Sequence, residues 1–163
     1  GVVWAGTAEP SEQQRVVSIQ TVGDLVEGRE VHSVGADISV REAARFMTEK
    51  KIGLVPVTDG EKVIGVFGER DLLKRVVSEG LDPETTRVND VMTTTMICSP
   101  PDETYQQAGS KMIEKGIRHL VIADGDQLVG VISLRDLRTH EIDEKSQEIE
   151  FLNDYLYFMP PLM

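Results

Sequence analysis

Two acidic residues, Asp71 and Asp136, stand near the ends of two closely similar segments. The first segment reads GVFGERDL (residues 65–72) and the second reads GVISLRDL (residues 130–137). A carboxylate near the start of a helix is stabilised by exposed amide groups and by the helix dipole. Held there, it can accept hydrogen bonds from two adjacent hydroxyl groups, such as those of a ribose. The plain structural alternative is that both residues only stabilise the starts of helices.

The two segments differ at one position that matters for such a site. Ser133 carries a hydroxyl that suits a phosphate or ribose oxygen, whereas its counterpart Gly68 has no side chain to offer. The alternative for Gly68 is a role in a backbone turn alone. If the Ser133 hydroxyl contacts the ligand, the two sites are unequal. The site built around Gly68 then binds more weakly or is adapted to another ligand.

The two segments belong to an internal repeat. A shift of 65 residues aligns residues 37–72 with residues 102–137 without a gap, and about a third of the aligned positions are identical. Upstream, VGDLV (residues 22–26) pairs with VNDVM (residues 88–92) at a shift of 66 residues. The duplication therefore includes a short lead-in to each copy.

Each copy carries the same signals for its elements. Ser39 to Glu42 and Thr104 to Gln107 read as capping boxes, which predict helices that begin directly after the hydroxyl residue. Two apolar runs separated by Asp-Gly follow, which is typical of a β-hairpin. Each copy is therefore predicted to run strand, helix, strand, strand, helix. The apolar faces of the two first helices are predicted at Val40, Ala43, Ala44 and Met47, and at Tyr105, Ala108, Gly109 and Met112.

Composition limits the classes of partner. The chain has 163 residues, of which 40% are hydrophobic and 28% charged, and its formal net charge is -11. Such an acidic chain is not expected to bind nucleic acid or an anionic membrane. No apolar run approaches the length that a membrane span needs. The single cysteine, Cys98, excludes an internal disulfide and predicts a reducing, cytoplasmic location.

The repeat resembles the CBS domain, named after cystathionine beta-synthase. The order of elements, the length of each copy, the two Arg-Asp-Leu endings and the phrase IRHLVI carry this resemblance over residues 21–140. Two tandem copies are similar to a CBS pair, or Bateman module. This implies an α/β fold of two pseudo-symmetric β-α-β-β-α motifs packed sheet to sheet, with their helices outside. The predicted division is into a flexible lead-in, motif 1, a connector, motif 2, and a C-terminal helix with its tail, at residues 1–20, 21–80, 81–86, 87–140 and 141–163.

The resemblance implies a regulatory protein rather than an enzyme. CBS pairs often bind adenine nucleotides in clefts between the copies, so AMP, ADP, ATP or NAD is the expected ligand and no cofactor is required. The implied role is that of an energy or redox sensor in which Asp71 and Asp136 hold ribose. The alternative is a dimerisation or adaptor module whose clefts are degenerate and empty. Gly68 and the pair Gly53-Leu54 favour that alternative.

Phosphate recognition needs cations, and the resemblance implies where they gather. The implied clefts combine Asp71 with Arg118, His119 and Arg135 in one, and Asp136 and Ser133 with Arg70 in the other. Because Gly53 and Leu54 replace the basic pair in the first copy, the more highly phosphorylated ligand is expected beside Asp71. The alternatives are a strand-end role for His119 and a solvated charge for Arg118.

An apolar slot for the base is expected beside these groups. Its candidate residues are Val34, Val55 and Pro56 from the first copy, and Ser99, Leu120 and Val121 from the second. A hydrophobic core has the same composition, and core is the preferred interpretation for most of them. No metal site is predicted, because His32, His119 and His140 are scattered and Cys98 has no partner at ligand spacing. No nucleophile and base stand at catalytic spacing either.

The C-terminal segment predicts one more helix with an apolar stripe. The stripe consists of Ile142, Ile149, Leu152, Tyr155, Leu156 and Met159, with acidic residues between them. Because CBS pairs resemble one another in forming flat homodimers, we expect this stripe to support a homodimer. The alternative is a helix that packs on its own module.

Overall fold

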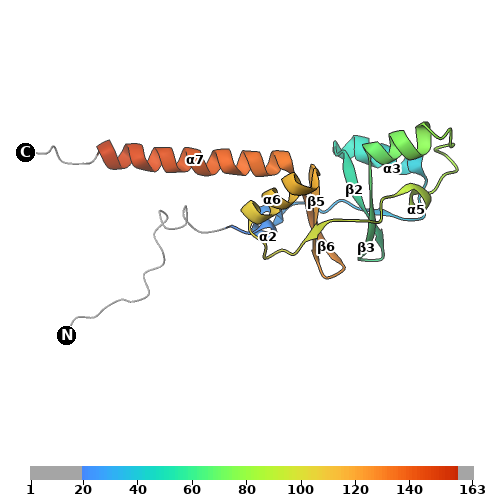
Figure 1. The fold of residues 1–163 in the computed structure, drawn as a ribbon, viewed down its shortest axis with the longest axis horizontal. Helices are drawn as coiled ribbons and strands as arrows, with labels where there is room; N and C mark the ends of the chain where they lie inside the picture. Colours follow the sequence, from blue (N-terminus) through green and yellow to red (C-terminus); the bar gives the residue numbers. More distant parts are fainter. Residues whose placement is uncertain (1–19, 158–163) are drawn as a thin grey trace, which may run out of the picture.

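Two similar groups of elements follow each other along the chain, and a long helix comes last (Figure 1). The structure is a computed structural model that describes residues 20–157, with their side chains except those of residues 142–144, 146–148, 151 and 153–157. Its elements are α2 (Val22–Val26), β1 (Val34–Gly35), α3 (Val40–Lys50), β2 (Leu54–Asp59), β3 (Lys62–Gly68), α4 (Glu69–Asp71), the π-helical turn η1 (Leu72–Val77), α5 (Val88–Val91), β4 (Cys98–Ser99), α6 (Tyr105–Lys115), β5 (His119–Asp124), β6 (Gln127–Ser133) and α7 (Leu134–Tyr157).

The strands form two equivalent three-stranded halves. Along the sheet the order is β1-β2-β3-β6-β5-β4, so that each half consists of a hairpin with a short parallel strand at its outer edge. Equivalent positions have equivalent partners: Val57 lies opposite Val34, and Ile122 lies opposite Ser99. The predicted α/β fold with two β-α-β-β-α motifs is confirmed.

The two halves pack against each other through a small apolar cluster. Only Lys62 and Gln127 pair between β3 and β6. Val63 of β3 is buried together with Val121 and Ala123 of β5, although these two strands are not neighbours in the sheet order. The two halves of the sheet are therefore joined at β3 and β6 and also pack on each other through side chains.

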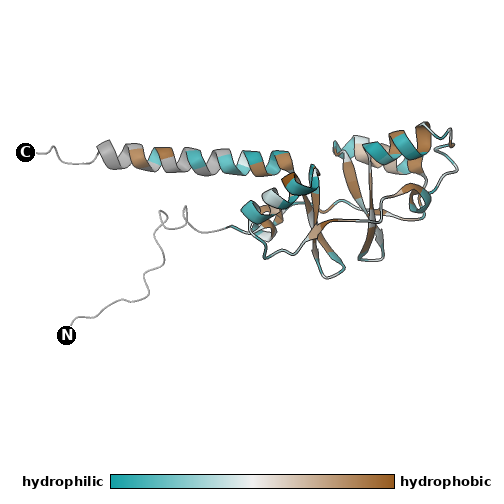
Figure 2. Ribbon diagram, in the orientation of Figure 1, coloured by the Kyte–Doolittle hydropathy of each residue, from teal (hydrophilic) through white to brown (hydrophobic). Residues whose placement is uncertain are grey.

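The local signals of the repeat produce the expected elements. At the start of α3, Ser39 Oγ accepts from the Glu42 amide at 3.1 Å, and Glu42 accepts the Ser39 amide in return. At the start of α6, Thr104 and Gln107 form the same reciprocal pair. The glycine of each Asp-Gly turn has a positive φ, 64° and 63°, which the hairpin geometry requires. In Figure 2 the strands are mostly coloured as apolar, whereas the helices carry both polar and apolar residues.

Helix α2 is the lead-in to the first repeat, but it packs into the core of the second repeat. Val22 and Val26 of α2 are buried in the core of the second repeat, which also contains Leu120 and Ile132. The main chain makes the same connection, because the Val22 amide donates to the Glu103 carbonyl at 2.8 Å. The first lead-in thus completes the second core.

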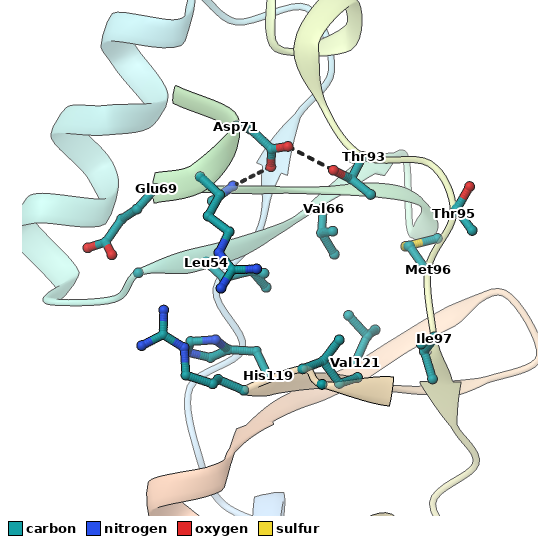
Figure 3. A pocket seen from close by; sticks show the side chains of 16 residues that line it. Leu54, Val66, Glu69, Asp71, Thr93, Thr95, Met96, Ile97, His119 and Val121 are labelled. Atoms are coloured by element: carbon teal, nitrogen blue, oxygen red, sulfur yellow. Dashed lines mark hydrogen bonds between the residues drawn. The ribbon is translucent and has the colours of Figure 1, made fainter. Parts of the chain in front are cut away.

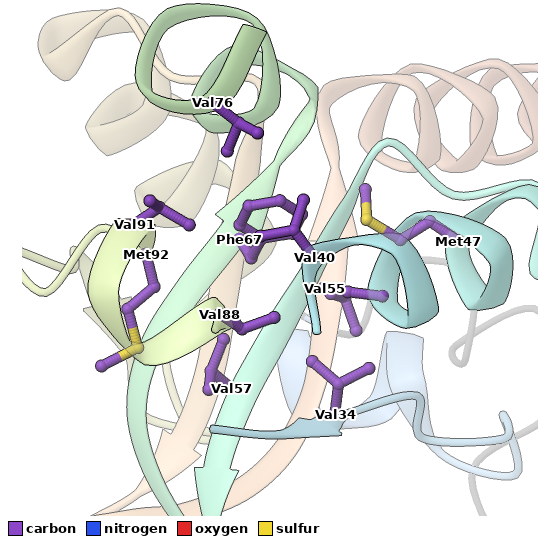
Figure 4. Close-up of a cluster of buried hydrophobic side chains, with 11 residues drawn as sticks. Val34, Val40, Met47, Val55, Val57, Phe67, Val76, Val88, Val91 and Met92 are labelled. Carbon is purple, nitrogen blue, oxygen red and sulfur yellow. The ribbon is translucent and has the colours of Figure 1, made fainter. Parts of the chain in front are cut away.

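The lead-in helix α5 makes the reciprocal exchange. Val88 and Val91 of α5 are buried in the core of the first repeat, around Phe67 (Figure 4). The Val88 amide donates to the Ile38 carbonyl at 3.0 Å. The repeat unit in the sequence is therefore not the packing unit in space, and each core contains one helix from the other copy.

Helix α7 joins two elements that the sequence treats as separate. The closing helix of the second repeat continues without a break into the C-terminal helix, giving one helix of 24 residues that runs away from the rest of the fold (Figure 1). Ile149 and Leu152 on it are 59% and 50% exposed, so these two residues do not pack on their own module. Met159 lies outside the described residues. None of the described helices has the length and apolarity that crossing a membrane demands.

The exchange of lead-in helices predicts which of the two cores a substitution in each helix perturbs. Val22→Ala and Val88→Ala each remove two methyl groups from a fully buried site, and each is expected to lower the free energy of unfolding by about 2–3 kcal/mol. In methyl NMR spectra, Val22→Ala should shift Leu120 and Ile122, whereas Val88→Ala should shift Val55 and Val57. A Val22→Ala spectrum that changes mainly around Val55 and Val57 would contradict the exchange.

Candidate ligand-binding clefts

The Asp71 cleft combines segments of both repeats. Its walls come from the end of β3 and α4 with Asp71, from the segment after α5 with Thr93 and Thr95, and from Arg118 and His119 just before and at the start of β5. Figure 3 shows the apolar side chains of Leu54, Val66, Met96, Ile97 and Val121 around the same space, which has a volume of about 290 Å³. The predicted grouping of Asp71 with Arg118 and His119 is present.

Both carboxylate oxygens of Asp71 have hydrogen-bond partners. Oδ2 accepts from the Gly68 amide at 2.9 Å, and Oδ1 accepts from the Thr93 hydroxyl at 2.7 Å (Figure 3). Arg75 Nε lies 3.9 Å from Oδ1, and the Asp71 side chain is only 12% exposed. Asp71 therefore stabilises the start of α4 and fixes the chain after α5, besides lining the cleft.

The Asp136 cleft is the pseudo-symmetric counterpart and is larger, with a volume of about 1070 Å³. Its walls come from the end of β6 and the start of α7, from residues 29–32 after α2, and from residues 51–54 before and at the start of β2. Arg118 and His119 also line it, and so does Glu69. These three residues line both clefts and stand at the boundary between them.

Asp136 is held by a complete capping box and by an ion pair. Its Oδ2 accepts from the Ser133 amide at 2.7 Å, and Ser133 Oγ accepts from the Asp136 amide at 3.1 Å. Arg29 Nη1 lies 3.3 Å from the same Oδ2, and the Asp136 side chain is 32% exposed. Gly68 lacks the return bond, and its φ of -137° is one that any residue adopts. No left-handed turn therefore requires glycine at this position, but a Cβ there would lie 3.2 Å from the Gly53 carbonyl oxygen, so the backbone role of Gly68 stays open.

The sequence-based distribution of cations between the clefts is wrong in two respects. Arg135 lines the Asp136 cleft and not the Asp71 cleft, and Arg70 does the reverse, because each arginine stays beside the aspartate that follows it. The Asp136 cleft is also not the less basic one. Its lysine and arginine residues are Arg29, Lys51, Arg118, Arg135 and Arg138, whereas those of the Asp71 cleft are Arg70 and Arg118.

Most of the predicted apolar slot belongs to the two cores. Val34 and Val55 are buried in the first core and Leu120 is buried in the second. Ser99 is fully buried, and its hydroxyl accepts from Lys111 Nζ at 3.1 Å. Of the candidates, Pro56 lines the Asp136 cleft and Val121 lines the Asp71 cleft. Strand residues alternate between faces, so the neighbours of each core residue face the cleft.

The residues that sequence reasoning missed come mainly from the chain that follows each lead-in helix. Thr93, Thr95, Met96 and Ile97 line one cleft, and residues 29–32 line the other. The signal was available in the lead-in match between residues 22–26 and 88–92. Without the exchange of these helices, however, the match does not say which aspartate each segment approaches.

His119 is half-buried between the two clefts. Burial lowers its pKa below the ordinary value of 6.5, and the nearby Arg118 lowers it further, while Asp136 and Glu69 oppose this effect. The imidazole is therefore mainly neutral at pH 7. Among the described residues, no group of three or more His, Cys, Asp or Glu is arranged to hold a metal ion.

The chain belongs to the CBS domain family. A family model described as the CBS domain matches residues 22–78 and 88–143, which are the two repeats. The chain is 30% identical to the CBS domain-containing protein YhcV of Bacillus subtilis (strain 168) over 117 residues, covering 72% of this chain and 83% of that protein. It is 27% identical to the mitochondrial CBS domain-containing protein CBSX3 of Arabidopsis thaliana over 147 residues, covering 83% and 71%. The chain is thus a CBS-pair regulatory module.

Solved structures and larger relatives agree with this assignment. A CBS-domain containing protein from Agrobacterium tumefaciens superimposes with a TM-score of 0.66 at 35% identity, covering 74% of this chain and 98% of that one. The arabinose 5-phosphate isomerase KdsD of Yersinia pestis is 36% identical over 111 residues, but this chain spans only 34% of its length. The similarity thus extends both to proteins of about this size and to part of a larger enzyme.

The lowered pKa of His119 predicts a pH dependence of stability. The unfolded chain binds this proton near pH 6.5, before the folded chain does, so the free energy of unfolding should fall as the pH drops below that value. His119→Gln removes this contribution. Urea unfolding of both proteins at several pH values between about 7.5 and 5.5 should show a smaller loss of stability for the variant. Identical slopes would contradict a depressed pKa.

Proposed function

We propose that this CBS pair senses the energy or redox state by binding an adenine nucleotide, AMP, ADP, ATP or NAD, in its clefts. The observation that carries the proposal is the repeated arrangement of a helix-start carboxylate, an apolar wall and basic side chains around one cavity. Asp71 and Asp136 offer oxygens to the two adjacent hydroxyls of a ribose. Arginine and lysine side chains are the usual partners of phosphate.

The apolar walls suit a planar base. In the Asp71 cleft, Leu54, Val66 and Met96 surround a cavity of about 290 Å³, near the lower end of the range for small-molecule sites. The alternative of an adaptor with empty clefts rests on Gly68 and on Gly53-Leu54. The basic residues that line both clefts favour a binding function over that alternative. We propose no catalytic activity, and the role is regulatory.

Replacing the carboxylates tests the ribose assignment. Asp71→Asn and Asp136→Asn keep the size of the side chain but remove its charge, and each should cost about 1.5–3 kcal/mol at its own cleft, or about 10- to 150-fold in affinity. Isothermal titration calorimetry with AMP, ADP, ATP and NAD measures the loss. Asp102→Asn is the matched control, because this exposed residue lies at the start of the second repeat and lines neither cleft.

Two results would count against these assignments in different ways. If none of the four nucleotides binds the unmutated protein, the sensor function is wrong. If the nucleotides bind but the two variants behave like Asp102→Asn, the ligand does not use these carboxylates.

We also propose that the chain forms a homodimer in which α7 pairs with a second copy of itself. Ile149 and Leu152 are exposed on α7, and the spacing of the apolar residues at 142, 149, 152 and 156 follows a seven-residue repeat. A stripe of this spacing is self-complementary, which favours the same helix of another protomer as the partner.

Truncation tests the helix pairing. A chain that ends after Asp143 lacks Ile149 and Leu152. It should form a weaker dimer, with a larger dissociation constant, or be less stable to unfolding. Light scattering at protein concentrations on the order of tens of micromolar measures the mass of both proteins. A full chain that is monomeric under these conditions would refute the homodimer.

A further inference from the structure

The two clefts differ in charge even though the repeat builds them from equivalent segments. Five lysine and arginine residues and three acidic residues line the Asp136 cleft, whereas two of each line the Asp71 cleft. His119 contributes to both and is mainly neutral at pH 7. The excess positive charge thus lies beside Asp136, where a polyanion gains the larger Coulomb attraction.

Lys51 reaches the Asp136 cleft from a backbone position that favours glycine. Its φ and ψ are 58° and 44°, in the left-handed region. The equivalent residue in the second repeat is Gly116, with φ and ψ of 65° and 32°. A side chain at this position has a steric cost that glycine avoids. The first repeat accepts that cost and places a lysine among the residues that line the cleft, where the second repeat has glycine.

Arg29 is the second cation that distinguishes the clefts. It follows the exchanged helix α2 and so approaches the aspartate of the other repeat, with Nη1 3.3 Å from Asp136 Oδ2. Its side chain is 45% exposed, so it is accessible to a ligand in the cleft. In the Asp71 cleft the segment after α5 contributes Thr95 instead, which is uncharged.

The two aspartates also differ in how much acceptor capacity is left. Within the described part of the chain, the Ser133 amide and the Arg29 guanidinium both contact Oδ2 of Asp136. Both oxygens of Asp71, by contrast, accept hydrogen bonds, and its side chain is the less exposed of the two. Asp136 Oδ1 therefore remains available to a ribose hydroxyl while Arg29 stays close to the ligand.

We propose that Arg29 and Lys51 are the residues that set ligand charge, and that they make the Asp136 cleft the site of the more highly phosphorylated nucleotide. The ribose binds Asp136, and the guanidinium of Arg29 turns from the carboxylate toward the phosphates, which Lys51 also contacts. The Asp71 cleft takes a ligand with fewer phosphates. This inference rests on the nucleotide binding proposed above and names the determinant of its selectivity.

A loss-of-charge variant tests the assignment at the Asp136 cleft. In an Asp71→Asn background, which weakens the other cleft, calorimetry measures the affinities for ATP and AMP with and without Arg29→Thr/Lys51→Gly. The double substitution should lower the ratio of ATP to AMP affinity by about 10-fold or more. It should also flatten the decrease of ATP affinity with added salt. Lys51→Gly installs the residue that the second repeat already has, so the folded backbone tolerates it.

A gain-of-charge variant provides the reciprocal test. In an Asp136→Asn background, Thr95→Arg/Gly116→Lys should raise the ratio of ATP to AMP affinity at the Asp71 cleft. Inorganic tripolyphosphate, which has neither base nor ribose, is the second probe and should bind the unmutated protein more tightly than Arg29→Thr/Lys51→Gly. Unfolding curves of each variant show that the fold is intact.

The outcomes separate this inference from the proposed function. If the nucleotides bind but the Arg29→Thr/Lys51→Gly substitutions leave the ATP to AMP ratio unchanged, charge selection by Arg29 and Lys51 is wrong and nucleotide sensing stands. If no nucleotide binds the unmutated protein, the proposed function falls and this inference falls with it.

Discussion

Each core of this protein needs a helix that belongs to the other repeat, and the remaining structure follows from this requirement. Val22 and Val26 fill the second core, and Val88 and Val91 fill the first. The chain that leaves each lead-in helix must then cross the interface between the halves. It passes the aspartate at the start of the closing helix there, so each cleft has walls from both repeats. The same burial of valine that stabilises the cores therefore positions Arg29 beside Asp136 and Thr93 beside Asp71.

Local structure could be predicted from the sequence because its signals are short-range. The capping boxes at Ser39 and Thr104 and the Asp-Gly turns depend on residues within one or two helical turns, and all of them form as expected. The exchange of lead-in helices depends on contacts between residues far apart in the chain. Val22 and Val88 occupy equivalent places in the repeat, so either core could bury either residue without any change in the apolar pattern. The pattern predicts that both are buried and leaves open in which core.

In the candidate clefts, too, the sequence predicts some residues and leaves the placement of others open. Asp71 and Asp136 stand out in the sequence as polar groups of a repeated motif, and the resemblance to the CBS domain indicates Arg118 and His119. Of the predicted apolar slot only Pro56 and Val121 line the clefts, because β2 and β5 are apolar on both faces and their alternation is hidden. Leu54 and Pro56 line clefts while Val55 is in the core, and His119 and Val121 line clefts while Leu120 is in the core. Only the three-dimensional arrangement separates the two sets.

Glu69, Arg118 and His119 line both clefts, and this has a thermodynamic consequence. In the proposed function, a ligand in one cleft lies beside charged groups that the other cleft also contacts. By linkage, whatever free energy the first ligand adds to or takes from the binding of the second, the second returns to the first in equal amount. Under the proposed function, the shared residues therefore couple the two clefts, so that the affinity for one ligand depends on the concentration of the other.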